Sequence, residues 1–368
     1  MTQIVHLTTA HPVKDNRIFR KECAALVEEG FNVTLVAVHP TTEVIDGVVV
    51  SGLPARSGRF ARMAIGPIDA WKRLQKIRPD VVHGHDPELI PVLVAYRLLN
   101  RKSRVIFDAH ESLPKQIAGK TYIPAVARPA VGRIARGLEK LADKYLDGIV
   151  VATPHIAESF SNSNTTLVQN FPWLRDFPSP TRYPQYANET VMSYVGAVSK
   201  GRGSDVMSRL PSLTENRTRL VVAGILAKDA EDDVLNGDDW GVDFRGKLSP
   251  EEIPPLIAAS NVGLCLLRPL PNYLESQATK MYEYMAAARP FVASNFPHWV
   301  SLFAEYDCGI FVDSEDSEAA ANAVDELADN PERAAEMGRN GRRAIEESFS
   351  FENEAARLAK LVRTLIAA

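Results

Sequence analysis

The chain has 368 residues, a mass of 40.5 kDa and a formal net charge of −4, and 45% of its residues are hydrophobic. This composition is typical of a globular protein, and the apolar runs fall short of the roughly 18 residues that a membrane span needs. The length predicts two domains, because single hydrophobic cores stop growing at about 250–300 residues. Three scattered cysteines and a start without a secretory signal favour a cytoplasmic location.

The charge is divided unevenly along the chain. Residues 1–175 carry 23 Lys and Arg against 16 Asp and Glu, a net of +7, whereas residues 176–368 carry 19 against 30, a net of −11. This asymmetry predicts that the first half faces something anionic, such as a phosphate or a membrane surface. We expect no nucleic-acid partner, since there is no recognition-helix pattern, zinc framework or stacking motif.

Short β-branched runs alternate with helical periodicity from the first residues onward. A helix is expected over 18–29, and Gly30 after it is typical of a helix end. Because the runs are mostly apolar on both faces, they indicate parallel strands covered by helices on both sides. The expected strands are 4–10, 31–38, 47–52, 80–85, 104–110 and 148–154.

A stretch with four prolines, 171–189, predicts a linker, after which the same alternation resumes. The fold class is therefore α/β, with two doubly wound, Rossmann-like parallel sheets whose ligands bind just after the strands. We predict domains at 1–175 and 176–350, and a last helix, 351–368, that can pack back on the first domain. Residues 317–368 have helical periodicity throughout. The expected strands of the second domain are 191–198, 219–225, 242–248, 262–269, 290–296 and 309–314.

The sharpest local signal is the segment 271–294, in which Glu275 and Glu283 are separated by seven residues. We expect Glu283 to open a helix, with Lys280 just before it. A glutamate at that point can simply complement the helix dipole. Carboxylates also accept hydrogen bonds from vicinal sugar hydroxyls, and a lysine beside unpaired backbone N–H groups can hold a phosphate. The segment therefore favours a nucleotide-sugar site.

This segment and six others, in order along nearly the whole chain, resemble the family 4 glycosyltransferases, retaining enzymes of the GT-B fold that include bacterial builders of surface polysaccharides. The resemblance implies two Rossmann-like domains facing a cleft. It implies transfer of a hexose-type sugar from a nucleoside-diphosphate sugar, UDP being favoured, to a hydroxyl of a glycan or lipid-linked acceptor. The resemblance implies no cofactor, because the nucleotide sugar is a substrate. It also implies no metal, because the GT-B fold does not use a bound metal for its chemistry. The other segments are 11–22, 81–88, 106–112, 194–203, 242–264 and 349–362.

The resemblance also implies roles for single residues. Arg202 and Lys280 match basic positions that neutralise the diphosphate as the leaving group gains charge. Glu283 matches the carboxylate on the ribose hydroxyls and Glu275 the one near the transferred sugar, while His110 matches a histidine beside the reacting carbon. The implied catalytic set is His110, Glu275, Arg202 and Lys280, and the implied donor-binding set is Glu283, Gly196, Lys200, Gly201, Gly203 and Met281.

The acceptor side is expected in the first domain. The resemblance places the loop with Asp15 and Arg17 there, although in isolation these two favour a loop ion pair with a capping role. His83, His85 and Asp86 are a weaker metal alternative, because no third nitrogen or sulfur ligand is predictable. The expected acceptor contacts are Asp15, Arg17, His85, Asp86 and Glu111.

Two departures from the family pattern keep other functions open. Ala197 stands where the family has Arg, and Arg289 where Gly is common. They leave a catalytically silent nucleotide-sugar-binding subunit as an alternative. A sugar-nucleotide 2-epimerase of the same fold is a further alternative. The glycines around Arg202 also suit a plain turn. Val206 stands where a dinucleotide fingerprint needs glycine, which disfavours a dehydrogenase, and the absence of a Walker loop excludes that mode of phosphate binding.

Basic residues accumulate in two helical stretches, the second interleaved with apolar residues. Such a face is typical of a peripheral enzyme on anionic lipid, although a merely solvated face is an equal alternative. We therefore expect contact with the inner face of the cell membrane. The basic residues are Arg56, Arg59, Arg62, Lys72, Arg73, Lys76 and Arg78, then Lys115, Lys120, Arg128, Arg133, Arg136, Lys140 and Lys144.

Overall fold

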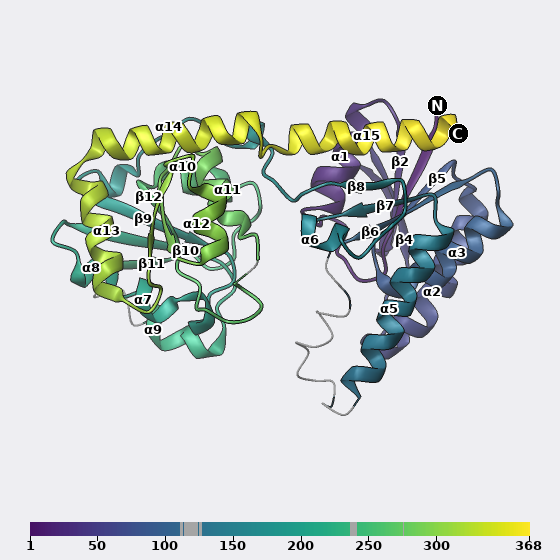
Figure 1. Cartoon of the computed structure of the whole chain (residues 1–368), viewed down its shortest axis with the longest axis horizontal. Coiled ribbons are helices and arrows are strands. Elements are labelled where there is room, and N and C mark those ends of the chain that lie inside the picture. The colour runs from purple at the N-terminus through teal and green to yellow at the C-terminus, as the bar shows by residue number, and fades with distance from the viewer. Residues whose placement is uncertain (111–112, 114–123, 125–126, 236–240, 275) are drawn as a thin grey trace. The chain divides into compact units, whose positions relative to one another are not determined.

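The computed structural model describes the chain apart from residues 111–112, 114–123, 125–126, 236–240 and 275 (Figure 1). It divides into two compact units. The first consists of Met1–Asn170 together with Phe351–Ala368, and the second is Phe171–Ser350. The first boundary therefore falls after residue 170, whereas the sequence predicts it at 175.

An eight-stranded sheet forms the centre of the first unit, in the order β3-β4-β2-β1-β5-β6-β7-β8. Neighbouring strands are parallel except β3 and β4, which form an antiparallel pair at one edge. The six expected runs all form strands, and the sequence analysis misses β3 and β8. The strands are β1 (Gln3–Leu7), β2 (Asn32–Val38), β3 (Thr42–Ile45), β4 (Val48–Leu53), β5 (Val81–Gly84), β6 (Arg104–Ala109), β7 (Gly148–Val151) and β8 (Thr165–Leu167).

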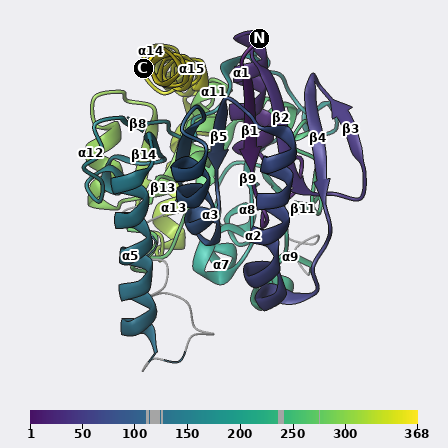
Figure 2. The same cartoon turned by 90° about the vertical axis from the view of Figure 1, so that its right-hand side faces the viewer.

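Helices cover both faces of this sheet. Figure 2 shows α2 (Gly58–Ile77), α3 (Ile90–Leu99) and α5 (Arg128–Tyr145) on one face, where they enclose an apolar core. A π-helical turn, Ile18–Cys23, continues into α1 (Ala24–Glu28) and packs with α15 (Phe351–Ala367) against the other face. A short helix, α6 (Pro154–Ala157), follows β7.

The last helix is an integral part of the first unit. The backbone N–H of Gln169 donates to the Glu354 carboxylate at 3.0 Å, and Arg363 pairs with Glu29. Leu358 and Val362 are fully buried. Because α15 buries a row of apolar side chains, it contributes to the stability of a unit whose other elements come from the opposite end of the chain.

A six-stranded sheet forms the second unit, in the order β11-β10-β9-β12-β13-β14 with every pair parallel. Apolar clusters lie on both of its faces, as the doubly wound pattern requires. The strands are β9 (Thr190–Val195), β10 (Thr218–Ala223), β11 (Val242–Phe244), β12 (Val262–Cys265), β13 (Phe291–Ser294) and β14 (Gly309–Val312). The helices are α7 (Ser204–Met207), α8 (Leu210–Leu213), α9 (Glu231–Leu235), α10 (Ile253–Ala259), α11 (Thr279–Ala286), α12 (Pro297–Phe303), α13 (Ser317–Asp329) and α14 (Pro331–Glu347).

The proline-rich stretch 171–189 is packed at its start, whereas most of its later residues are exposed. Phe171, Trp173 and Phe177 are buried, and the rings of Phe171 and Phe177 belong to the core of the second unit. Aromatic side chains drive this packing, because each buries a large apolar area. The prolines of this stretch give no sign of these buried rings.

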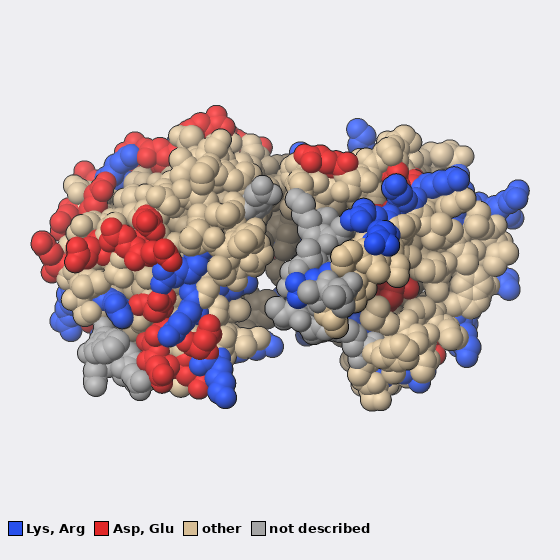
Figure 3. All heavy atoms as spheres, turned by 60° about the horizontal axis from the view of Figure 1, so that its bottom comes forward, with Lys and Arg blue, Asp and Glu red and all other residues tan. Residues whose placement is uncertain are grey.

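The charge asymmetry of the sequence is visible on the surface. In Figure 3 the Asp and Glu side chains gather on the second unit, whereas Lys and Arg predominate over Asp and Glu on the first. In the part of the chain that the structure describes, no helix has the length and apolar character of a membrane span.

Candidate functional site

The carboxyl ends of three neighbouring strands bring polar loops together in the first unit. β5 pairs in parallel with both β1 and β6, so the residues that follow these strands meet at one edge of the sheet. His11 follows β1, His85 and Asp86 follow β5, and His110 follows β6. The ring of His110 lies 5.4 Å from the ring of His11 and 5.4 Å from that of His85.

Asp86 shapes the loop after β1. Its buried carboxylate accepts hydrogen bonds from the Thr8 hydroxyl at 3.0 Å and from the backbone N–H groups of Thr9 and Ala10. The other oxygen lies 3.5 Å from Nε2 of His11. Asp86, an expected acceptor contact, is thus engaged in orienting the loop and its histidine.

Arg17 and Asp108 form a buried ion pair beneath this edge. The guanidinium donates from Nε and Nη2 to Asp108 at 3.0 and 2.9 Å and from Nη1 to the Val168 carbonyl at 2.8 Å. Burial alone would raise the pKa of Asp108, but Arg17, His110 and His85 hold it well below its usual range. Arg17 therefore holds the sheet edge together. Its N–H groups bond to protein oxygens and are not directed at an acceptor substrate.

Asp15 has the capping role that its sequence context favours in isolation. One carboxylate oxygen accepts from the backbone N–H groups of Arg17 and Ile18 at 2.9 Å each, which starts the π-helical turn. The other oxygen lies 3.3 Å from Nδ1 of His11. Burial works against ionisation of Asp15, but His11 and the two N–H groups lower its pKa to about 2.

His85 is buried and engaged at both nitrogens. Nδ1 lies 3.1 Å from Asp108 and Nε2 lies 2.9 Å from Nδ1 of His6. Burial, the largest effect, lowers its pKa to about 3. His110 is more accessible, with a side chain 22% exposed and Nε2 at 3.5 Å from Asp108. Burial lowers the pKa of His110 as well, so it is a neutral imidazole at physiological pH.

A pocket of about 370 Å³ opens beside His11 at the carboxyl ends of β1, β2 and β4. Its lining includes Thr9 and His11, Arg56 from the segment before α2, and Arg62 from the start of α2. Arg56 is paired with Asp69, and Arg62 lies 3.4 Å from Glu88. The mixture of hydroxyl, imidazole and guanidinium groups suits a polar, hydroxyl-bearing ligand.

In the second unit, two cations converge at the carboxyl ends of β9 and β12. Nζ of Lys280 lies 4.1 Å from the centre of the Tyr194 ring, and the Arg202 guanidinium lies 5.6 Å from the centre of the Tyr273 ring. Burial raises the pKa of Cys265 to about 11 against the opposing charges of both cations. Among the described residues neither cation has a carboxylate ion pair. Such a pair of cations is suited to an anion.

Glycines let the backbone pass close to these cations. Gly196, after β9, has φ +121°, and a Cβ there would lie 3.8 Å from Nζ of Lys280. Gly203 has φ +78°, and its Cβ would meet the Leu266 carbonyl oxygen at 2.1 Å. Gly224, which the sequence analysis does not single out, has φ +156°, and its Cβ would overlap the Gly196 carbonyl. Only glycine fits these positions without backbone movement.

The helix α11 begins earlier than the sequence suggests. It starts at Thr279, so Lys280 lies in its first turn and Glu283 in its second. Glu283 is half-buried and is too far along the helix to cap its start. Met281, expected at the nucleotide, has a fully buried side chain in the core of the unit.

The remaining expected donor residues lie on the loop after β9. Lys200 is exposed, and its backbone N–H donates to Asp229 at 3.3 Å. Gly201 lies against Leu270, and a Cβ added to Gly201 would lie 3.3 Å from the Leu270 side chain. Glu275 and Glu111 lie outside the described residues.

Of the two departures from the family pattern, Arg289 has a local explanation and Ala197 has none. Nothing in the structure explains the alanine at position 197, whose backbone carbonyl accepts a hydrogen bond from the Tyr194 hydroxyl at 2.7 Å. Arg289 donates to the carbonyls of Thr181 and Ala258, and burial lowers its pKa to about 10. Arg289 thus secures the stretch before β9 to the end of α10.

Two groups of side chains among the described residues have the spacing of metal ligands. One is His6, Glu22, His83 and His85, and the other is His85, Asp108 and His110. Asp108 is already engaged by Arg17, which weakens the second group as a metal site. Sequence reasoning missed His6 and Glu22, whose proximity depends on strand register.

Profiles of two sequence families match the chain. The one described as "Glycosyltransferase Family 4" matches residues 16–166, and the one described as "Glycosyl transferases group 1" matches residues 180–344. Together they span most of both units. The chain belongs to the group 1 glycosyltransferases, with a GT-B fold.

Individual relatives of this glycosyltransferase are distant. The spore coat protein SA of Bacillus subtilis is 25% identical over 46% of this chain and 47% of its own length. The chain therefore spans less than half of that protein. A D-inositol 3-phosphate glycosyltransferase of Corynebacterium aurimucosum is 22% identical over 85% of this chain and 76% of its own length.

Solved structures show the same fold. The sucrose-phosphate synthase of Thermosynechococcus elongatus superimposes with a TM-score of 0.73 at 17% identity, covering 100% of both chains. Anabaena HepE in complex with UDP gives 0.71 at 12% identity, covering 99% of this chain and 100% of HepE. At such identities the likeness concerns the fold alone.

Proposed function

We propose that this glycosyltransferase transfers a hexose-type sugar, with retention of anomeric configuration, from a nucleoside-diphosphate sugar to a hydroxyl of a glycan or lipid-linked acceptor. The observation that carries the proposal is the pair Lys280 and Arg202, held near the tyrosine rings with no carboxylate ion pair among the described residues. UDP is the favoured nucleotide, and HepE, of the same fold, is known in complex with UDP.

The donor binds on the second unit. Lys280 and Arg202 hold the diphosphate, and the backbone at Gly196 and Gly203 approaches it closely because no side chain intervenes. Glu283, one turn further along α11 than Lys280, accepts the ribose hydroxyls. Glu275 and Lys200 keep the roles that the family resemblance implies, near the transferred sugar and at the diphosphate.

The acceptor binds on the first unit. The pocket beside His11 offers hydroxyl, imidazole and guanidinium groups to a sugar or to a phosphorylated acceptor. His110, which is more accessible than His85, lies next to His11. It keeps the role that the family resemblance implies, beside the reacting carbon of the donor sugar. Its neutral imidazole can donate or accept one hydrogen bond without adding charge.

The transfer step needs no protein nucleophile and no metal. The bond between the anomeric carbon and the diphosphate oxygen breaks, and the acceptor oxygen bonds to that carbon on the same face. The proton of the acceptor hydroxyl passes to the departing diphosphate. Lys280 and Arg202 stabilise the charge that develops on this leaving group, which is electrostatic catalysis.

Two variants test the proposal. Glu283→Ala and Arg202→Ala are each expected to abolish transfer while the fold, read by circular dichroism, stays intact. A panel of nucleotide sugars is incubated with the protein, with and without glycan acceptors, and released nucleotide and thermal shift are measured. Unchanged transfer rates in both variants would exclude the proposed site.

The same panel separates the alternatives. Epimerisation of a UDP-sugar with no acceptor present would identify a 2-epimerase. Nucleotide binding without turnover on any acceptor would identify a catalytically silent subunit. A transferase releases nucleotide slowly alone and much faster with its acceptor.

We further propose that α2 and α5 rest on anionic lipid. Phe60 and Ile68 of α2 and Ile134 of α5 are large apolar side chains exposed by 87%, 52% and 64%, and they stand among basic residues of the same helices. Lys115 and Lys120 of the second basic stretch lie outside the described residues. Flotation with anionic vesicles at low salt tests this contact, with Phe60→Ser expected to weaken it. Failure of the unaltered protein to float would exclude it.

A further inference from the structure

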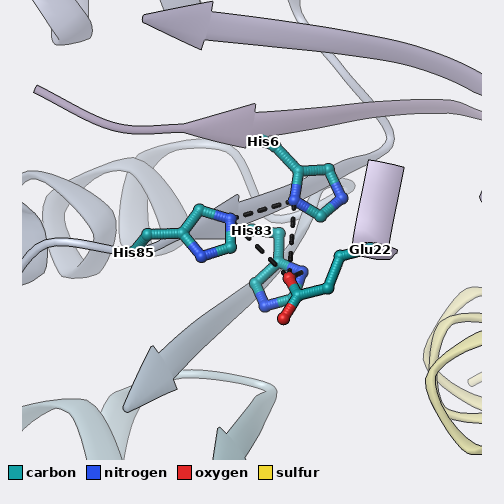
Figure 4. Close-up of side chains that lie close together, drawn as sticks. All are labelled: His6, Glu22, His83 and His85. Atoms are coloured by element: carbon teal, nitrogen blue, oxygen red, sulfur yellow. Dashed lines mark hydrogen bonds and ion pairs between the residues drawn. The ribbon is translucent and has the colours of Figure 1, made fainter. Parts of the chain in front are cut away.

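The interior of the first unit contains four potential metal ligands on one face of the sheet. His6 on β1 and His83 on β5 are register partners of a parallel pair, so their side chains point to the same face. His85 lies two residues after His83 and returns to that face. Glu22 reaches the three rings from the π-helical turn that covers them, as Figure 4 shows.

The ligand atoms of this cluster are spaced as around a single ion. Oε2 of Glu22 lies 3.8 Å from Nδ1 of His6, 3.9 Å from Nδ1 of His83 and 3.9 Å from Nε2 of His85. Nδ1 of His6 and Nε2 of His85 are 2.9 Å apart. Tetrahedral zinc, with bonds of about 2.0–2.2 Å, places its ligand atoms roughly 3.4 Å from one another.

The cluster has polar atoms that nothing else in the described structure satisfies. All four side chains are fully buried or nearly so, and both nitrogens of His83 and both oxygens of Glu22 have no hydrogen-bond partner. Arg17 Nε lies 3.0 Å from Glu22, but its single N–H donates to Asp108. Buried polar atoms without partners are costly, and a cation among them would remove that cost.

A second shell of the kind found at metal sites is already present. Nδ1 of His85 lies 3.1 Å from Asp108, which leaves Nε2 directed at the cluster, and Arg17 holds Asp108 in turn. Carboxylate–histidine–metal arrangements fix the tautomer and orientation of a ligating ring in this way. Asp86, the third residue of the motif that suggests a metal in the sequence, is engaged with Thr8 and Thr9 and takes no part.

We propose that His6, Glu22, His83 and His85 bind one structural Zn²⁺ ion. Three imidazoles and one carboxylate form a four-ligand set that suits zinc, whereas calcium and magnesium prefer oxygen ligands throughout. All four ligands come from the protein and are buried, so the site is closed and leaves no position for a substrate. The ion ties the π-helical turn to β1 and β5 beneath the acceptor pocket and takes no part in sugar transfer.

Metal content tests this site independently of activity. The full chain, produced without a histidine tag, is freed of metal with EDTA, reloaded with Zn²⁺ and desalted, and zinc is measured by mass spectrometry. About one equivalent per chain is expected to remain. Co²⁺ added to the metal-free protein should give the intense visible absorption of a tetrahedral site, and Zn²⁺ should raise its melting temperature. Less than about a tenth of an equivalent in the unaltered chain would overturn the proposal.

Variants decide which residues bind the ion. His83→Gln and His6→Gln should each lose the bound zinc, whereas His155→Gln, a histidine with a side chain 51% exposed, should keep it. His110→Gln should also keep it. Zinc lost from His110→Gln but retained by His83→Gln would overturn the assignment in favour of the other group. Because the result for the unaltered chain stands by itself, the test holds even if a variant fails to fold.

Discussion

The two units treat buried charge in opposite ways. In the first, Arg17 and Asp108 neutralise each other in a bidentate pair, and Glu22 lies against them, all nearly inaccessible. In the second, Lys280 and Arg202 lie near aromatic rings and, within the described residues, without a carboxylate ion pair. Breaking a buried ion pair is costly because it leaves one charge uncompensated, whereas cations left without a counterion provide a place for an anionic ligand. The four predictions below test this contrast.

Removal of Arg17 is expected to have the largest effect. Arg17→Ala leaves the buried Asp108 carboxylate unpaired, which should lower the free energy of unfolding by about 3–5 kcal/mol. Arg56→Ala, which breaks the more exposed pair with Asp69, is the matched control and should cost less than about 1 kcal/mol. Urea denaturation measures both. Equal losses in the free energy of unfolding would show that burial of the Arg17–Asp108 pair does not increase the cost of breaking it.

Replacement of Lys280 should affect catalysis more than stability. Lys280→Met keeps the buried aliphatic stem but removes the charge, so sugar transfer should fall by about 100- to 1,000-fold while the melting temperature changes little. Lys228→Met, at an exposed lysine, is the control and should leave the rate unchanged. The measurement is kcat with a saturating acceptor. A rate within twofold of the unaltered enzyme would remove Lys280 from the donor site.

Substitution of Gly203 tests whether the backbone near the cations can carry a side chain. Gly203→Ala combines a positive φ with a contact to the Leu266 carbonyl and should cost at least about 2 kcal/mol. Gly30→Ala has a similar φ of +83° but no atom within 4 Å of the added carbon, and should cost about 1 kcal/mol. The difference between the two unfolding free energies isolates the contact. Gly203→Ala should also bind UDP more weakly than the unaltered chain, whereas Gly30→Ala should not.

The pair His11 and Asp15 should give the smallest effect, through pH. The hydrogen bond to Asp15 raises the pKa of His11 above its usual 6.5, against the effect of burial. Its stabilisation is therefore complete below about pH 6.5 and is lost as pH rises through the folded-state pKa. His11→Gln should narrow the difference in stability between pH 6 and pH 9 by less than about 1 kcal/mol, since the pair is partly exposed. A variant with the same pH profile as the unaltered chain would contradict this.

Much of the fold could be predicted from the sequence. The apolar runs form strands because they are buried on both faces, a constraint that the sequence records directly. β3 was not predicted because three of its four residues are exposed. β8 was not predicted because it is only three residues long. In the stretch 171–189, proline indicates an irregular backbone but does not reveal whether neighbouring rings, such as those of Phe171 and Phe177, are buried.

The site could be predicted only in part. Residues that follow strands, such as His110 and Asp86, could be placed at one edge because that rule depends on topology alone. The sequence could not show which of these residues face a ligand. Arg17, for example, is bound by Asp108, and these two residues lie 91 positions apart along the chain. The same holds for Glu22 and His6, which only strand register and the path of the π-helical turn bring together.

The position of α15 has a consequence for synthesis. The first unit needs residues 351–368, and these leave the ribosome after the whole second unit has been made. Until then the face that Leu358 and Val362 cover has no partner helix, so the N-terminal unit cannot complete its folding first, as N-terminal domains usually do. Completion of the first unit therefore waits until residues 351–368 have been translated, and a product that stops before them carries an exposed apolar face open to chaperones and proteases.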